Sequence, residues 1–234
     1  MARAGIPLLA VLIDADNSSP RWAEAIFDEI AALGEASVRR IYGDFSRPQM
    51  NGWQAVLPAL ALVPHHQPAN TVGKNSSDIA LVIDAMDLLH SGRFDGFVLV
   101  SSDSDFTRLA SRIREHGLDV YGIGQQKTPE AFRKACKRFI FVENLLSESE
   151  PDTRDAPRRE SPSKARPLLV AALHALDHDQ DWVPLGQLGQ TILASHPDFD
   201  SRTYGCAKLS ELVQKAGGFE MRKTGNNPEV RTKP

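Results

Sequence analysis

The feature that most constrains the fold of this chain is an apolar run that ends in an acidic loop. Residues Phe97–Val100 are apolar without alternation, which is typical of a parallel strand buried on both faces. The next residues include Asp103 and Asp105, and a helix is expected to begin near Phe106. Ligands bind at the carboxyl ends of strands in open parallel sheets, so this strand would present two carboxylates at a binding edge.

The same design recurs near the N-terminus. In residues 9–19 (LAVLIDADNSS), an apolar run leads to Asp14, Asp16 and Asn17, and a helix is expected from Pro20. A single Asp in such a loop could serve only as a helix N-cap, for which Asp is a preferred residue. Two such loops in one chain favour a shared acidic site.

Strands and helices alternate up to about residue 144, which predicts an α/β fold with a parallel, doubly wound, Rossmann-like sheet. The expected strands are residues 7–13, 38–42, 97–100, 119–123 and 139–142. Residues 64–68 are expected to form an irregular extended segment. A helix from Ser76 or Ser77 through Leu89 is expected to bury a stripe of apolar side chains. The stripe consists of Ile79, Val82, Ile83 and Met86.

The character of the chain changes after this region. Residues 147–166 are charged, contain prolines and have almost no apolar side chains, which predicts a flexible linker. Three amphipathic helical patterns follow, and then two short strands around the turn sequence TGNNP, which together predict a small winged-helix module. The expected domains are therefore residues 1–146 and 167–234, joined by the linker.

Composition narrows the class of protein. No apolar run approaches the ~20 residues of a transmembrane helix. The N-terminal apolar run leads directly into the acidic cluster, so it is not expected to be a signal peptide. Cys136 and Cys206 lie far apart, which argues against a zinc site or a disulfide framework. These features predict a cytoplasmic protein without a membrane partner, and they do not predict its oligomeric state.

A third source of carboxylates is the helix that begins near Ser76. Asp78 falls in its first turn, where an acid could instead simply complement the helix dipole, worth ~0.3–1 kcal/mol. Asp84 and Asp87 lie further along and are assigned to a solvated face, although Asp84 is also kept as a candidate supporting residue.

Together these segments supply an oxygen-only set of candidate metal ligands. The four are Asp14, Asp78, Asp103 and Asp105. Such a set selects Mg²⁺ or Mn²⁺, and without a cation the carboxylates would repel one another. The metal would polarise a phosphodiester, lower the pKa of a bound water and orient an in-line attack. Asn17 could fix Asp14 or a water, and Ser102 and Ser104 could supply supporting hydrogen bonds.

Residues from about 8 to 144 resemble the NYN domain, a PIN-like nuclease fold, in its bacterial LabA-like branch. The resemblance is carried by IDADN at 13–17, by KNSSDIA at 74–80 with the following Asp84, and by SSDSDF at 101–106. It implies a metal-dependent ribonuclease site built from the four carboxylates with Asn17 beside them. Asp16 is expected to be peripheral.

The C-terminal part, from about 167 to 232, resembles an OST-HTH (LOTUS) domain. The resemblance is carried by residues 185–188, by PDFDSRTYG at 197–205 and by KLSEL at 208–212. It implies a module that binds RNA or, in some cases, a protein partner.

Local basic residues would have to meet RNA phosphates, because the net charge of −3 provides no overall basic field. In the N-terminal part the candidates are Arg108, Arg112, Arg133, Lys134 and Lys137, and in the C-terminal part they are Lys208 and Lys223. Alternatively, the residues from Arg133 onward form a solvated helix end that the helix dipole favours.

Three functions are compatible with these observations. The leading hypothesis is a metal-dependent endoribonuclease. The second is a phosphatase of the haloacid-dehalogenase type, with Asp14 as nucleophile and Asp16 as acid/base, against which stand Asp78 and the RNA-type module. The third is a regulatory scaffold that binds RNA or protein without catalysis.

Overall fold

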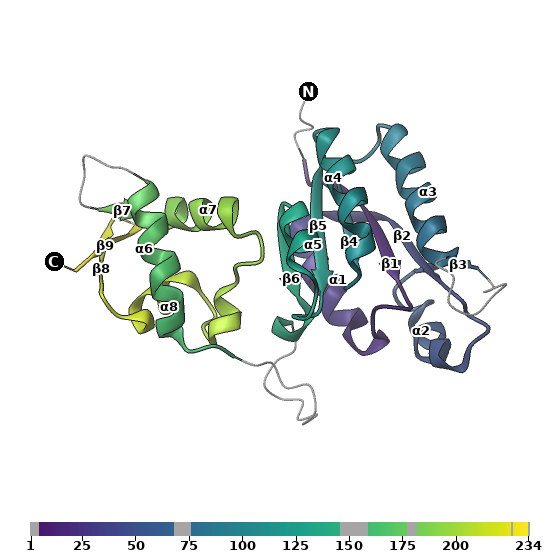
Figure 1. Ribbon diagram of the computed structural model, residues 1–234, viewed down its shortest axis with the longest axis horizontal. Coiled ribbons are helices and arrows are strands. Elements are labelled where there is room, and N and C mark those ends of the chain that lie inside the picture. Colours follow the sequence, from purple (N-terminus) through teal and green to yellow (C-terminus); the bar gives the residue numbers. More distant parts are fainter. Residues whose placement is uncertain (1–4, 68–75, 146–158, 177–181, 226, 234) are drawn as a thin grey trace. The chain divides into compact units, whose positions relative to one another are not determined.

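The computed structural model describes residues 5–67, 76–145, 159–176, 182–225 and 227–233 (Figure 1). Contacts divide the chain into two compact units, residues 1–150 and 151–234. Several sequence-based expectations lie outside the described residues: Lys74 and Asn75 of the second motif, residues 147–158 of the predicted linker, and Asn226 of the TGNNP turn.

The N-terminal unit is built on a six-stranded, entirely parallel sheet in the order β3-β2-β1-β4-β5-β6. The strands are β1 (Leu8–Asp14), β2 (Glu35–Gly43), β3 (Val63–His66), β4 (Gly96–Val100), β5 (Asp119–Gly124) and β6 (Arg138–Phe141). The predicted α/β, Rossmann-like fold is confirmed.

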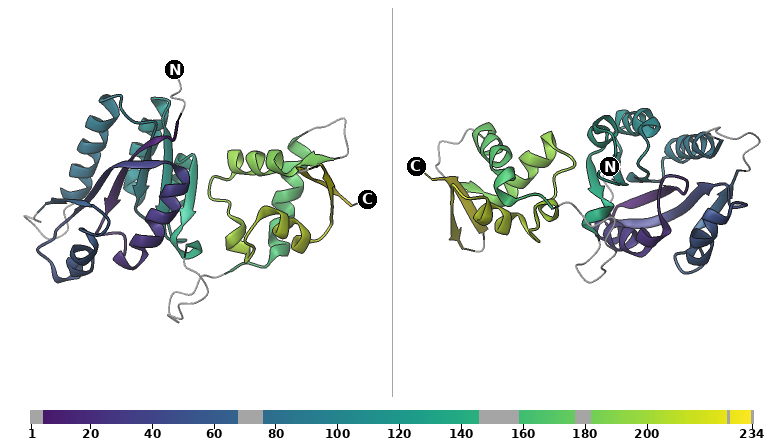
Figure 2. Two further views of the ribbon diagram at one scale, coloured as in Figure 1. Left: turned by 180° about the vertical axis from the view of Figure 1, so that it is seen from behind. Right: turned by 60° about the horizontal axis from the view of Figure 1, so that its bottom comes forward.

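Helices cover both faces of this sheet (Figures 1 and 2). They are α1 (Ala23–Leu33), α2 (Asn51–Val56), α3 (Ser76–His90), α4 (Thr107–Glu115) and α5 (Glu130–Ala135), with short 3-10 turns η1 (Pro20–Trp22), η2 (Pro48–Met50), η3 (Ser104–Phe106) and η4 (Val142–Asn144). Along β1, Leu12 packs in the core under α3 and α4, whereas Val11 and Ile13 pack in the core under α1 and α2. The unbroken apolar runs of β1 and β4 are therefore explained by burial on both faces.

The segment expected to be irregular contains strand β3, which pairs with β2 through the partners Arg40↔Val63 and Tyr42↔His65. Its Pro64 has no N–H to donate, and this is tolerated because β3 is the edge strand of the sheet. The extended conformation of residues 64–66 was expected, whereas their regular pairing with β2 was not, and residue 68 lies outside the described residues.

The buried face of α3 also differs from the expected stripe. Ile79 and Ile83 are 61% and 57% exposed. Val82 and Met86 of the expected stripe are partly buried and pack against the core. The residues of α3 that are fully inside it are Leu81, Ala85, Leu88 and Leu89. Apolar residues occur almost all round this helix, so its sequence does not fix which face turns inward.

The C-terminal unit combines helices with a three-stranded antiparallel sheet in the order β7-β9-β8. Its elements are η5 (Pro162–Ala165), α6 (Arg166–Ala175), β7 (Val183–Pro184), α7 (Leu185–Ser195), η6 (Ser201–Tyr204), α8 (Leu209–Ala216), β8 (Phe219–Thr224) and β9 (Asn227–Thr232). Its core is centred on Leu169, Leu188 and Leu212. Residues 159–166, expected to be linker, belong to this unit, since Ala165 is buried in its core and Glu160 N donates to Thr203 O at 2.8 Å.

None of the helices in the described parts of the chain is long and apolar enough to cross a membrane.

Candidate acidic site at the carboxyl edge of the sheet

Asp14 is the last residue of β1 and is almost fully buried, with 1% of its surface exposed. Its Oδ2 accepts a 2.7 Å hydrogen bond from Ser101 Oγ. Its Oδ1 accepts from the backbone N atoms of Asp16 (3.1 Å) and Asn17 (3.2 Å). Burial raises the pKa of Asp14, and the hydrogen bonds from Ser101 and Asn17 oppose that rise. Asp14 is therefore a rigidly held carboxylate.

The loop after β4 is anchored to Asp14 through Ser101. β1 and β4 are neighbours, so the residue that follows β4 lies beside the end of β1. Ser101 Oγ also accepts from Asp103 N at 3.0 Å. Asp103 Oδ1 in turn accepts from Asp105 N at 2.9 Å and caps η3. Asp103 thus combines the capping role with a position at the acidic site.

The pKa of Asp78 is affected by several nearby carboxylates. Partial burial raises its pKa to about 6, and nearby carboxylates contribute to the rise. Those carboxylates are Asp14, Asp103, Asp16 and Asp105. The structure therefore brings the four predicted carboxylates to one edge of the sheet, together with Asp16. These five residues are called the acidic site below.

Asp16 was expected to be peripheral. It is exposed, but its Oδ2 accepts from Ser77 Oγ at 3.0 Å, which ties the β1 loop to the first turn of α3. Its charge also raises the pKa values of both Asp14 and Asp78. Asp16 is therefore linked to the group by its hydrogen bond to Ser77 and by its charge, which agrees with a supporting position.

The serines that contact the carboxylates are not the two expected from the sequence. Ser102 Oγ accepts from Gln125 N at 2.9 Å and fastens its loop to the end of β5. Ser104 is exposed at the start of η3. Sequence reasoning missed Ser101 and Ser77. The available signal was position, since each lies directly at the end of a strand or in the first turn of a helix, next to a predicted carboxylate.

Asp84 belongs to a separate polar cluster and not to the solvated face to which it was assigned. It accepts from Tyr42 Oη at 2.6 Å, pairs with Arg40 Nη1 at 2.8 Å and lies 3.3 Å from His65 Nδ1. Burial and Asp84 raise the pKa of Tyr42, whereas burial lowers the pKa of His65 against the pull of Asp84. These four residues are called the Asp84 cluster. The expectation failed because it did not include β3, which places His65 next to Tyr42.

The basic residues predicted to contact RNA are spread over several elements. Arg108 is exposed on α4, and Arg133 places its guanidinium 5.7 Å from the centre of the Phe141 ring. Three others form ion pairs: Arg112–Glu115 (3.2 Å), Lys134–Glu130 (2.7 Å) and Lys137–Asp119 (2.6 Å). Lys208 and Lys223 are exposed in the C-terminal unit. Exposed ion pairs are worth only ~0–1 kcal/mol, so pairing does not prevent these cations from meeting phosphates.

The donor set of the acidic site suits a hard divalent cation, because it consists of carboxylate oxygens. As the side chains stand, no three His, Cys, Asp or Glu residues of the described chain are arranged to hold a metal ion. Binding would therefore require side chains such as Asp78 and Asp103 to turn toward the fixed Asp14. Burial is the main cause of the raised pKa of Asp78, and the repulsion from nearby carboxylates that adds to it is what a bound cation would relieve.

Comparisons with known proteins identify both units. The NYN domain family matches residues 8–146, and the OST-HTH/LOTUS domain family matches residues 160–231. A protein of unknown function from Vibrio parahaemolyticus is 20% identical, with a TM-score of 0.49, over 59% of this chain and 94% of that chain. An uncharacterized protein from Nitrosomonas europaea is 30% identical, with a TM-score of 0.28, over 38% of this chain and 90% of that chain. No curated protein matches. Because the NYN match spans more than half of its residues, the chain belongs to the NYN domain family and carries a C-terminal OST-HTH/LOTUS domain.

Proposed function

We propose that the N-terminal unit is a metal-dependent ribonuclease that cleaves RNA internally, and that the C-terminal unit binds RNA or a partner. NYN domains are a PIN-like family to which ribonuclease activity is attributed. The observation that carries the proposal is the gathering of five carboxylates from β1, α3 and the β4 loop, where partial burial, with a contribution from the charges of the other four, raises the pKa of Asp78 to about 6. Structural roles such as capping account for single carboxylates but not for this repulsion.

Asp14, Asp78, Asp103 and Asp105 would hold the cation. Mg²⁺ or Mn²⁺ bound there would supply Lewis-acid polarisation of a phosphodiester and a water of lowered pKa. The chain's own contribution is positioning. Ser101 and Asn17 keep the Asp14 carboxylate in one orientation and favour its ionised form.

The phosphatase alternative fits the geometry of Asp14 poorly. A nucleophilic carboxylate needs an oxygen that can reach the substrate. Asp14 is buried, and each of its oxygens already accepts a hydrogen bond from Ser101, Asp16 or Asn17. A nucleophilic role would require Asp14 to give up one of these hydrogen bonds and to reach an incoming phosphate from its buried position.

In the C-terminal unit, Tyr204 is half-buried with its ring 6.2 Å from that of Phe199, so packing suits it better than base stacking. The β8–β9 hairpin, together with Trp182, carries an aromatic and basic surface. The guanidinium groups of Arg222 and Arg231 lie 4.4 and 4.5 Å from the centre of the Trp182 ring. Both also form ion pairs, with Glu229 at 2.6 Å and with Glu220 at 2.7 Å. With the exposed Lys223, this combination of aromatic and basic groups suits nucleic acid.

The test is cleavage of single-stranded and structured RNAs with Mg²⁺, Mn²⁺ or EDTA. Wild type is compared with a double variant, Asp14→Asn with Asp103→Asn, shown to be folded by circular dichroism. Asp87→Asn, which removes an exposed carboxylate of α3, is the matched control. Cleavage that needs metal and is lost only in the double variant supports the proposal. A wild type that binds RNA but leaves it intact under every condition would favour the scaffold.

A further inference from the structure

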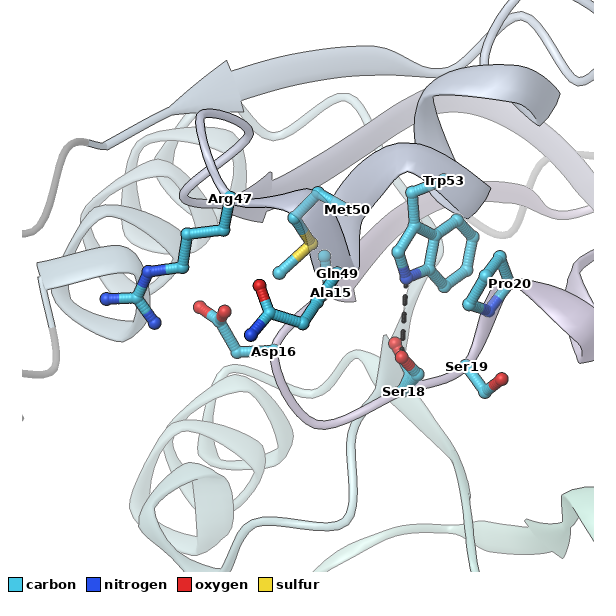
Figure 3. Close-up of a pocket in the computed structure, with 9 residues that line it drawn as sticks. All are labelled: Ala15, Asp16, Ser18, Ser19, Pro20, Arg47, Gln49, Met50 and Trp53. Atoms are coloured by element: carbon cyan, nitrogen blue, oxygen red, sulfur yellow. Dashed lines mark hydrogen bonds between the residues drawn. The ribbon is translucent and has the colours of Figure 1, made fainter.

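A pocket of about 380 Å³ adjoins the acidic site between the loop after β1 and the segment from η2 to α2 (Figure 3). Its volume falls in the ~300–1,000 Å³ range of sites for small organic ligands. Asp16 lines the pocket and also raises the pKa of Asp78, so the pocket and the acidic site share a wall.

The walls of the pocket are held rigidly. Trp53 is 1% exposed, and its Nε1 donates to Ser18 O at 3.3 Å, which fixes the β1 loop against α2 (Figure 3). A Cβ on Gly52 would lie 2.7 Å from Pro20 Cγ, so the close approach of α2 to η1 depends on a glycine. Met50 and Trp53 form a buried apolar floor. The pocket is therefore preformed.

The polar groups of the rim come from both segments. In Figure 3 the carboxylate of Asp16 lies between the amide of Gln49 and the guanidinium of Arg47, which is the outermost of the three groups. Arg47 Nε pairs at 3.1 Å with Oδ2 of the buried Asp44, which orients the guanidinium. An oriented cation, an amide that both donates and accepts, and an apolar floor occur together in this one pocket.

This combination matches one unit of a nucleic acid. A guanidinium suits a phosphate through paired, charge-assisted hydrogen bonds. An amide and a carboxylate can read the donors and acceptors of a base edge, and bases splayed from single-stranded RNA pack against apolar surface. We propose that the pocket binds the nucleotide next to the scissile phosphate of a single-stranded RNA, with Arg47 on its phosphate and Gln49 and Asp16 on its base. The inference rests on the proposed ribonuclease function of the adjoining acidic site.

The first measurement is binding, which does not require catalysis. The full-length chain carrying Asp103→Asn is titrated in EDTA with four short single-stranded RNAs, each made of one kind of base. Calorimetry measures the binding. Adding Arg47→Ala is expected to weaken binding at least 10-fold, and Arg47→Lys to restore part of it. Gln49→Glu places a negative charge in the pocket without disturbing Asp44, and the same weakening is expected. Arg93→Ala removes an exposed arginine at the opposite end of β4 and is the matched control, with no change expected.

The second measurement is the cleavage pattern of the otherwise unmodified chain. Arg47→Ala should raise KM about 10-fold with little change in kcat, and Gln49→Ala should flatten the base preference at the position next to the cut. If the pocket variants behave as Arg93→Ala does while metal-dependent cleavage persists, the pocket proposal fails and the ribonuclease proposal stands. If wild type never cleaves but the pocket variants still lose RNA binding, the ribonuclease proposal fails and the pocket keeps its ligand. A wild type that binds no RNA would overturn the pocket proposal.

Discussion

Ser101 Oγ joins Asp14 Oδ2 by a 2.7 Å hydrogen bond between residues 87 positions apart in the sequence. The same hydroxyl accepts from Asp103 N, so a single side chain fixes the geometry of two loops of the acidic site. Such a contact is expected to contribute to the stability of the fold and, under the proposed function, to the affinity for a cation.

Replacing Ser101 by alanine should therefore affect both properties. The unfolding free energy is expected to fall by ~1–3 kcal/mol, because a buried carboxylate oxygen and the Asp103 N–H lose their partner. Loss of an outer partner of a ligand typically costs ~10–100-fold in metal affinity. Urea denaturation and Mn²⁺ titration measure the two effects. Ser104→Ala, which removes an exposed hydroxyl nearby, should change neither; equal behaviour of the two variants would refute the role assigned to Ser101.

The pKa of Asp78 predicts how stability depends on pH when no divalent cation is bound. Its pKa is raised from 3.8 to about 6 in the folded chain, so the folded state binds the proton more tightly than the unfolded state. The cost of ionising Asp78 in the folded state is absent below its pKa in the unfolded chain and complete above its pKa in the folded chain. The unfolding free energy should therefore fall as pH rises between these two values. Solvent screening of the half-buried side chain limits the effect to about 1 kcal/mol.

Urea denaturation in EDTA at several pH values between about 4 and 7 measures the slope of unfolding free energy against pH. Asp78→Asn should flatten it, because the amide does not titrate. Millimolar Mg²⁺ should remove it at the upper end of the window by neutralising the repulsion. A slope that is the same in wild type and in the Asn variant would show that other groups cause it.

The parts of the fold that the sequence made predictable are those whose pattern has one physical explanation. Unbroken apolar runs in β1 and β4 can be satisfied only by burial on both faces, and the acids after them must then lie at the carboxyl edge. Strand β3 gave no such pattern, because an edge strand containing Pro64 and His65 depends on its partner β2 for its identity. The choice between Ser101 and Ser102 as the donor to Asp14 depends on the direction of each side chain at the strand end, which residue type does not encode.

The Asp84 cluster provides a test between a structural role and a supporting role at the acidic site. Asp84→Asn removes the charge that pairs with Arg40 and weakens the bond from Tyr42 Oη, so a loss of ~1–3 kcal/mol in unfolding free energy is expected. Tyr42→Phe should lose less, because it leaves the ion pair in place. Mn²⁺ affinity of both folded variants should equal that of wild type. A drop in affinity specific to Asp84→Asn would instead make Asp84 part of the metal-binding machinery.

Gly124 connects backbone packing to the acidic site. It ends β5, and a Cβ at this position would lie 2.4 Å from the backbone O of Ser101. Gly124→Ala must therefore shift Ser101 relative to Asp14 or strain β5, and a loss of ~1–3 kcal/mol in unfolding free energy is expected, as for other overpacked sites. Because Ser101 moves, Mn²⁺ affinity should fall as well. Gly186→Ala is the control, since a Cβ there meets no atom within 4 Å and lies in helix α7, where alanine should stabilise by up to about 1 kcal/mol. If Gly124→Ala lowers stability but leaves metal affinity untouched, the backbone of Ser101 is not what positions Asp14.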